Sequence, residues 1–384
     1  MTADYYSNEC DVENLILMIP GPTWVRPAIR RAGSFPEFGH RDSSAKSLIE
    51  SIHKDLAVIA QLPEDYDSIL INGSGTNGME SAIRSLAAPG DRILCVSVGI
   101  FGDLFHSISI ANGFDAKKLT FPYGQGIDIE ELDRVLSDSH YDLVTITQNE
   151  SSTGVKTDIE SACRTIKDHG AMSIVDGVSI FGGCSSLISE SRPDIYVTAT
   201  QKCLAVPAGF SIAFISPDAQ KKAVRVPSRG YTTDILGHLK LAKQSQTLTT
   251  PSSTLLNQMY TQLRYIVDEE GIDCRFDRHK KSQQYVRQWA AQHEQLRLFV
   301  DEDSASLSLT TIEVPTSLNR VLLKDLLRAK GYLIDTGHAK LNQILLMNSE
   351  LPLIRIPHMG DVSIEMLETF LFELKLGLNQ SFDN

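Results

Sequence analysis

The sequence lacks long apolar runs and has no excess of positive charge. No window approaches the roughly 18 consecutive apolar residues of a membrane-spanning helix, so we expect no membrane partner. The 36 Lys and Arg residues stand against 48 Asp and Glu residues, a formal net charge of −12. Nucleic acids and anionic membranes attract clustered basic residues, so this balance argues against both, although it leaves room for a local basic pocket that binds a small anion.

Cysteines are few and scattered, without a CxxC pair or a Cys/His cluster. Such spacing does not suit a zinc site, and we expect free thiols in a reducing compartment. Residues 1–14 are polar and acidic, unlike a signal or transit peptide, and the C-terminus matches no retention or peroxisomal signal. These features favour a cytoplasmic protein. The six cysteines are Cys10, Cys95, Cys163, Cys184, Cys203 and Cys274.

The composition is that of an ordinary globular protein, with 42% hydrophobic and 22% charged residues in a chain of 384. Short apolar runs rich in β-branched residues alternate with amphipathic stretches through the first two thirds, which predicts buried strands separated by helices. This alternation is typical of an α/β fold with a mostly parallel central sheet and helices on both faces. The predicted strands are residues 68–71, 92–96, 143–146, 173–175 and 195–197, and helical patterns cover residues 77–87, 129–136 and 159–169.

The pattern changes after residue 250. We therefore predict a large domain over residues 16–250 and a smaller C-terminal α+β domain over residues 251–384, with residues 1–15 packing near the smaller one. In order, the second part should contain helices at 255–269 and 274–298, a strand at 307–314, a helix at 317–330, strands at 332–335 and 353–356, and a helix at 364–376.

Four loops that follow predicted strands carry candidate chemistry, because ligands of open α/β sheets bind beyond the carboxyl ends of the strands. Residues 72–78 (NGSGTNG) could bind a phosphate, because glycines let the backbone approach an anion and the N–H groups of a helix N-terminus face it. The alternative is that they form only a tight turn into the helix. Residues 148–154 are rich in hydrogen-bonding groups, which also fits a turn. Asp176 is a helix N-cap, a metal ligand or a partner for a protonated ring nitrogen. Lys202 precedes an apolar stretch, where a desolvated amine becomes a nucleophile.

Taken together and in this order, the four loops suit pyridoxal 5′-phosphate. This cofactor needs a phosphate cradle, a lysine that holds its aldehyde as an imine, and a carboxylate that keeps the pyridine nitrogen protonated. Lys202 follows Asp176 by 26 residues, one strand further along the chain.

The sequence resembles the class V aminotransferases, within the fold type I pyridoxal-phosphate enzymes, and most of all the branch that uses alanine or serine with glyoxylate or pyruvate. The resemblance covers nearly the whole chain from residue 19 onward. It rests on the motifs GSGTNGME (73–80), ESSTGV (150–155), VDGVS (175–179), QKCL (201–204), SRGY (228–231), TTPS (249–252) and RIPHMGD (355–361).

The resemblance implies a role for each matching residue. Lys202 would form the Schiff base and then shift the substrate proton, Asp176 would pair with the ring nitrogen, and Arg355 would clamp the substrate α-carboxylate. Thr250 would reach the cofactor of a neighbouring subunit, which implies a homodimer with shared active sites. The remaining cofactor-binding residues would be Gly75, Thr76 and Gln201 at the phosphate, Phe101 and Val178 on the two ring faces, and Ser151 at the ring oxygen.

Two departures from the family pattern concern the substrate rather than the cofactor. Gln148 stands where many relatives have His, and residues 342–351 are expected to lengthen the loop before Arg355. The leading hypothesis is amino transfer from alanine or serine to glyoxylate or pyruvate. The alternatives are a 2-aminoethylphosphonate–pyruvate aminotransferase, a pyridoxal-phosphate lyase or decarboxylase and, more remotely, a non-catalytic binding protein of the same fold.

Overall fold

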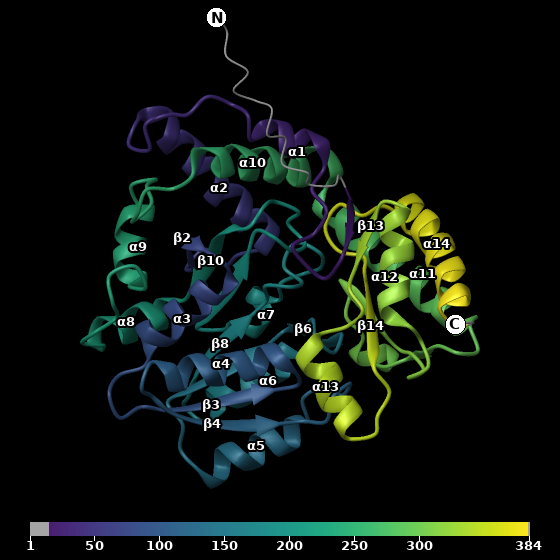
Figure 1. Ribbon diagram of the computed structural model, residues 1–384. Coiled ribbons are helices and arrows are strands. Elements are labelled where there is room, and N and C mark those ends of the chain that lie inside the picture. Colours follow the sequence, from purple (N-terminus) through teal and green to yellow (C-terminus); the bar gives the residue numbers. More distant parts are fainter. Residues whose placement is uncertain (1–14, 383–384) are drawn as a thin grey trace, which may run out of the picture.

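The computed structural model describes residues 15–382 and is built around a seven-stranded sheet (Figure 1). The strand order is β4–β3–β5–β8–β9–β10–β2, and only β10 runs antiparallel to its neighbours. The expected mostly parallel sheet is therefore confirmed. Its strands are β2 (Asp67–Gly73), β3 (Arg92–Ser97), β4 (Asp115–Thr120), β5 (Leu143–Thr147), β8 (Met172–Asp176), β9 (Ile195–Ala199) and β10 (Gly209–Ile215).

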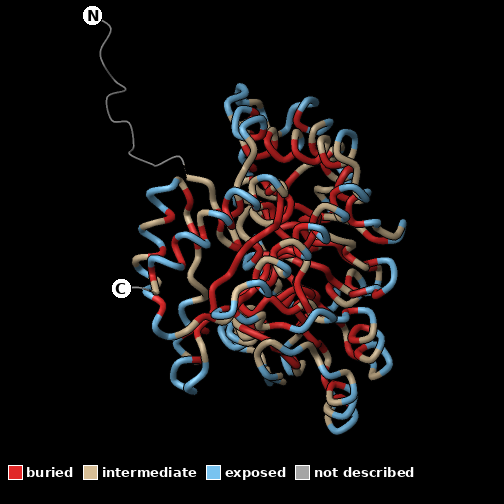
Figure 2. The backbone as a smooth tube through the Cα atoms, turned by 90° about the vertical axis from the view of Figure 1, so that its right-hand side faces the viewer, coloured by how far each residue is buried: buried red, intermediate tan, exposed pale blue. Residues whose placement is uncertain are grey.

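Helices cover both faces of this sheet. Successive strand residues point to opposite faces, so neighbours such as Ile69 and Leu70 belong to different apolar clusters. The Leu70 face is covered by α2 (Ser43–Ala60), α5 (Ile129–Asp138), α6 (Ile159–Asp168) and α10 (Ser253–Arg264). The Ile69 face is covered by α3 (Gly75–Leu86), α4 (Ile100–Ala111), α8 (Pro217–Arg225) and α9 (Ile235–Ala242). Figure 2 shows the buried backbone gathered in the interior, with exposed segments toward the outside.

A smaller layer follows the sheet in sequence. It contains α11 (Ile272–Ala291), α12 (Arg320–Ala329), α13 (Ala339–Met347) and α14 (Ile364–Phe382), with a sheet of β11 (Arg297–Leu298), β12 (Leu309–Glu313) and β14 (Leu353–Pro357). The N-terminal strand β1 (Ile16–Met18) pairs in parallel with β13 (Tyr332–Ile334). The shorter elements are α1 (Pro27–Ala32), the hairpin β6 (Asn149–Glu150) and β7 (Val155–Lys156), α7 (Ile188–Ser191), a π-helix (Tyr265–Glu270) and a 3-10 turn (Glu302–Ser304).

The apolar clusters show where the two ends of the chain pack. Met18 of β1 belongs to the cluster of the C-terminal layer, whereas Leu256 and Met259 of α10 belong to the cluster of the large sheet. The division into residues 16–250 and 251–384 stays a prediction. Of the N-terminal segment 1–15, which was expected near the smaller domain, residues 1–14 lie outside the described residues.

Two local predictions were wrong. The helix expected to reach residue 298 ends at Ala291, because Arg297 and Leu298 pair with β12 instead. The segment 342–351, expected as a loop, is mostly the helix α13, whose buried Leu341 and Leu345 pack against Leu353 of β14.

Within residues 15–382, no helix combines the length and the hydropathy that crossing a bilayer requires. Cys95, Cys163, Cys184, Cys203 and Cys274 are free thiols, and Cys10 lies outside the described residues.

Candidate active site

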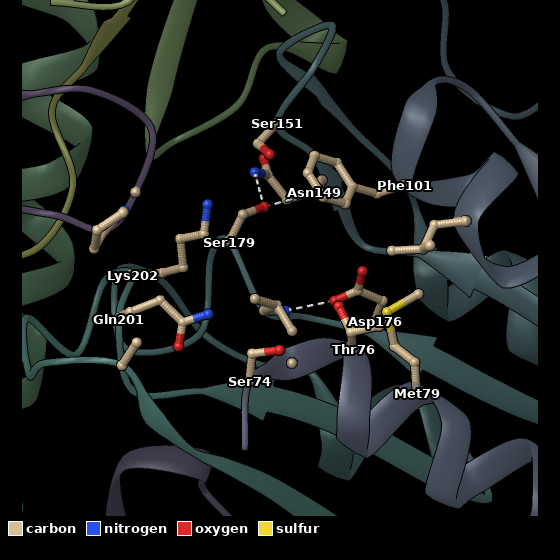
Figure 3. Close-up of a pocket in the computed structure, with 16 residues that line it drawn as sticks. Ser74, Thr76, Met79, Phe101, Asn149, Ser151, Asp176, Ser179, Gln201 and Lys202 are labelled. Carbon is tan, nitrogen blue, oxygen red and sulfur yellow. Dashed lines mark hydrogen bonds between the residues drawn. The ribbon is translucent and has the colours of Figure 1, made fainter. Parts of the chain in front are cut away.

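The carboxyl ends of β2, β5, β8 and β9 meet at a cavity of about 270 Å³ (Figure 3). Eight residues expected at the cofactor lie there together: Gly75, Thr76, Phe101, Ser151, Asp176, Val178, Gln201 and Lys202. The wall also includes Gly21, Pro22, Ser74, Met79, Leu104, Asn149, Ser179 and Ala208. The strand-end loops singled out from the sequence therefore surround one space.

Asp176 is the last residue of β8 and is 4% exposed. Its Oδ1 accepts a hydrogen bond of 2.7 Å from the backbone N–H of Val178. Burial, with a smaller contribution from the charge of Glu150, raises the pKa of Asp176 to about 7, although the hydrogen bond from Val178 and the charge of Lys202 oppose the rise. This carboxylate would be stabilised by a positive group placed in the cavity.

Lys202 lies in the loop after β9, and its Nζ donates a hydrogen bond to the carbonyl oxygen of Pro20. Burial, with a contribution from the charge of Arg355, lowers the pKa of Lys202 to about 8. A Cβ atom on Gly21 would lie 2.5 Å from Nζ, and Gly21 has a φ of +119°, so glycine suits this position on both counts. The lysine amine is thus partly neutral near neutral pH and lies against Pro20 and Gly21.

The start of α3 forms the lower wall of the cavity in Figure 3. Ser74 is the N-cap, and Asn77 Oδ1 accepts a hydrogen bond of 2.9 Å from the Ser74 N–H. A Cβ atom on Gly75 would lie 2.6 Å from Val178, so glycine allows the helix to approach that side chain. The first N–H groups of a helix have no acceptor within the helix, which makes this end suitable for an anion.

Phe101, in the first turn of α4, is held in place by a buried carboxylate that the sequence analysis did not single out. Glu150 Oε2 accepts hydrogen bonds from the N–H groups of Phe101 (2.9 Å) and Gly102 (3.1 Å). Glu150 Oε1 accepts two more from the N–H (3.0 Å) and hydroxyl (2.7 Å) of Ser152. An acidic residue inside the quoted motif 150–155 was the available signal, but its partners come from α4.

Arg355 on β14 stands behind the cavity wall rather than in it. Its Nη1 donates a hydrogen bond of 2.8 Å to the carbonyl oxygen of Ser151, and its Nη2 is paired with Asp335. Its Nε is buried and has no hydrogen-bond partner. The guanidinium expected to bind the substrate carboxylate therefore contacts the cavity wall at Ser151, and its Nε has no hydrogen-bond partner.

Thr250 does not line this cavity. It is exposed on the surface of the chain, and its carbonyl oxygen accepts a hydrogen bond of 2.7 Å from Asn72 Nδ2. Its assigned role toward a neighbouring subunit stays a prediction.

Asn149 and Ser179 belong to the wall but had no role assigned from the sequence, although Asn149 precedes the motif 150–155 and Ser179 ends the motif 175–179. Asn149 Nδ2 donates hydrogen bonds to the hydroxyls of Ser179 (2.7 Å) and Ser308 (3.2 Å), which ties the ends of β5 and β8 to the C-terminal layer. Behind this wall the Tyr196 hydroxyl is hydrogen-bonded to Gln148.

The residues of the cavity fit pyridoxal phosphate. Asp176 is a buried carboxylate suited to a protonated ring nitrogen, and Lys202 offers an amine of lowered pKa for the aldehyde. Gly75 and Thr76 open a helix whose N-terminus suits a phosphate.

Comparison with known proteins places this geometry in a family. The model of the class-V aminotransferases matches residues 31–359. An uncharacterized aminotransferase of Methanocaldococcus jannaschii is 31% identical over 354 residues, which are 91% of this chain and 89% of that protein. The (S)-ureidoglycine–glyoxylate transaminase of Bacillus subtilis is 27% identical over 339 residues, 82% of this chain and 80% of that protein.

Solved structures agree on the fold. The alanine–glyoxylate aminotransferase of Nostoc sp. superposes with a TM-score of 0.89 at 24% identity, covering 96% of this chain and 97% of that one. The match spans both the large sheet and the C-terminal layer. The chain therefore belongs to the class V aminotransferases, enzymes of fold type I that depend on pyridoxal 5′-phosphate.

Proposed function

We propose that this aminotransferase moves an amino group from a small neutral amino acid, alanine or serine, to a small 2-oxo acid, glyoxylate or pyruvate. The observation that carries the proposal is the joint placement of Lys202, Asp176 and the Arg355–Ser151 contact around one small cavity. Relatives named for glyoxylate as the acceptor support it, among them the transaminase of Bacillus subtilis and the alanine–glyoxylate aminotransferase of Mus musculus.

In this proposal the cavity residues hold the cofactor and leave its reactive side toward Lys202. Pyridoxal phosphate, when bound, supplies an aldehyde carbon and a ring that withdraws electrons. Asp176 would hold a proton on the ring nitrogen, and Gly75, Thr76 and Gln201 would bind the phosphate. Phe101, Val178 and Ser151 would hold the ring.

Lys202 moves the proton. Its amine has a pKa lowered to about 8, so a useful fraction is neutral at physiological pH and accepts the proton from the substrate α-carbon. The same amine, once protonated, returns that proton to a neighbouring carbon. Burial of the amine under Pro20 and Gly21 keeps water away from it during this transfer.

Arg355 holds the substrate α-carboxylate. A guanidinium offers five N–H donors in a plane and binds a carboxylate better than an ammonium does. Its buried Nε has no hydrogen-bond partner, and an unpaired buried donor is costly, so a carboxylate oxygen at this atom would be favourable.

The same proposal includes a homodimer. Thr250 is exposed and lies outside the cavity of its own chain, as expected if it serves the site of a second copy. Tyr231, in the quoted motif 228–231, is 74% exposed, and a large aromatic side chain of this kind suits an interface.

Product analysis tests the proposed reaction. The purified holoenzyme is mixed with L-alanine and glyoxylate, and pyruvate and glycine are measured over time. We expect equal amounts of the two products, and none from Lys202→Ala. Failure with alanine, serine and every other small neutral donor would refute the proposal, while carbon dioxide or ammonia released without a matching amino acid would indicate a decarboxylase or a lyase.

A further inference from the structure

The guanidinium of Arg355 is already partly occupied by the protein itself. Nη1 donates to the carbonyl oxygen of Ser151 and Nη2 is paired with the carboxylate of Asp335, while Nε has no hydrogen-bond partner. The side chains of Arg355 and Asp335 are 7% and 22% exposed, so the pair is largely shielded from solvent. Two of the three nitrogens therefore have protein partners before any substrate arrives.

Asp335 is fixed in this position by the backbone. It directly follows β13, and an isolated antiparallel bridge joins it to Arg355, with the Arg355 N–H donating to the Asp335 carbonyl oxygen at 3.4 Å. Gly337, two residues later, has a φ of +96°, and a Cβ atom there would lie 2.1 Å from the Leu353 carbonyl oxygen. The turn after Asp335 thus packs directly against β14, the strand that carries Arg355.

This arrangement sets the charge available to a substrate. Asp335 balances Arg355, and the lining of the cavity contains one further cation, Lys202, and no arginine. One substrate carboxylate can use the free Nε of Arg355. A second carboxylate on the same substrate would be near the charge of Asp335, and this chain's cavity lining offers it no arginine.

His338 does not supply the missing positive charge. Its ring lies edge-on to Phe101, with the ring centroids 6.2 Å apart, so it stands beside the cavity wall. Burial, followed by the charge of Arg355, lowers the pKa of His338 below 6.5, so it is neutral at physiological pH. Its Nδ1 is buried without a hydrogen-bond partner.

We propose that Asp335 is a specificity-determining residue that restricts the substrates to acids with a single carboxylate and excludes dicarboxylic amino acids. The proposal rests on the amino transfer and on the role of Arg355 proposed above, and it adds the residue that sets the substrate class. Asp335 acts by occupying one nitrogen of the clamp and by repelling a second negative charge.

Competition between donors tests this role. The holoenzyme and its Asp335→Asn variant are assayed with glyoxylate and either L-alanine or L-aspartate, and kcat/KM is measured for each donor. Asn keeps the shape and an acceptor oxygen but removes the charge. We expect the aspartate-to-alanine ratio of kcat/KM to rise about tenfold or more, mainly through the KM of aspartate, because a like charge has been removed from a shielded site.

Two matched variants separate charge from general damage. Asp335→Glu keeps the charge and should keep the ratio of the unmodified enzyme. Asp325→Asn removes an exposed carboxylate on α12, in the same layer but outside the cavity lining, and should also leave the ratio unchanged. An unchanged ratio in Asp335→Asn, or an unmodified enzyme that prefers aspartate to alanine, would overturn the proposal while leaving the amino transfer intact.

Binding without reaction gives a second readout. Propionate and succinate have one and two carboxylates and no amino group, and calorimetry measures the affinity of the holoenzyme for each. We expect Asp335→Asn to improve succinate binding about tenfold relative to propionate. If no donor is transaminated at all, the proposed function fails and this comparison still decides the role of Asp335, since an unchanged relative affinity would overturn it.

Discussion

Asp176 ends β8 and Lys202 lies in the loop after the neighbouring parallel strand β9, and burial shifts the pKa of each toward neutrality, upward to about 7 for Asp176 and downward to about 8 for Lys202. Burial disfavours the charged form of either group, so both changes have the same physical cause. Each residue is therefore poised between two protonation states in the range where cells work. A lysine of this kind serves both as a nucleophile and as a proton carrier.

The first prediction concerns the titration of Lys202. In the cofactor-free chain we expect its amine to react with a neutral acylating reagent along a curve centred near pH 8 rather than 10.5. The sign follows from the neutral form being the nucleophile, so labelling is slow below pH 8 and rises through it. Peptide mass spectrometry after timed labelling gives the midpoint.

Arg355→Gln provides the control for this titration. The positive charge of Arg355 contributes to the lowered pKa of Lys202, so its removal should move the midpoint upward. A midpoint near 10.5 in the unmodified chain would show that the amine is not desolvated.

Sequence reasoning singled out Asp176 because it directly follows an apolar run and Lys202 because it precedes one, and both are local signals. It did not find Asp335 or the role of Glu150, since their partners come from other elements. Aspartate is common on protein surfaces, so Asp335 gives no signal in the sequence before the fold places it beside Arg355 of β14. Glu150 likewise accepts a hydrogen bond from Phe101 of α4, a segment distant in the sequence. Pairing of this kind is set by tertiary structure and leaves no mark in the local pattern.

At the scale of elements, the contact between β6 and α4 should contribute measurably to the free energy of unfolding. Glu150 is fully buried and accepts hydrogen bonds from Phe101, Gly102 and Ser152. We expect Glu150→Ala to lower the free energy of unfolding by about 2–4 kcal/mol, because three buried N–H groups lose their acceptor. Urea unfolding followed by circular dichroism measures the change.

Glu160→Ala is the matched control. Glu160 lies in the first turn of α6, where it is exposed and pairs with the exposed Arg164. Its removal should change the free energy of unfolding by less than about 0.5 kcal/mol. Equal effects of the two substitutions would contradict a special role for the buried carboxylate.

Five strands of the large sheet could be predicted from the sequence, whereas no element had been assigned to β4, β10, α2, α4, α8 or α9. Two of the errors have a clear physical reason. The edge strand β4 carries Lys117 and Lys118 and is mostly exposed, so it lacks the apolar run of a buried strand. Residues 342–351 were expected to be a lengthened loop and are mostly in α13, of which only one side is buried. Both errors arise where one face of an element meets solvent.

At the scale of the whole molecule, the proposed dimer predicts complementation between two inactive variants. Lys202→Ala removes the proton carrier, and Thr250→Glu should place a negative charge next to the partner's cofactor phosphate. A mixed dimer would contain one site with both natural residues. We expect an equimolar coexpression to recover about a quarter of the normal activity, as random pairing into symmetric dimers gives.

Sedimentation of the same samples provides the accompanying measurement. The unmodified chain should sediment at twice the monomer mass of 42.4 kDa. Absence of recovered activity in a sample that is dimeric would rule out the shared site, and a monomeric active enzyme would rule out the dimer.

The pairing of β1 with β13 also has a consequence for synthesis of the chain. Strand β1 emerges from the ribosome long before its partner at residues 332–334. Pro20 and Gly21, which cover Lys202, directly follow β1, so their final position waits for that late strand. The large sheet can form while translation proceeds, but we expect the covering of the lysine to be completed only after residues 332–334 have left the ribosome.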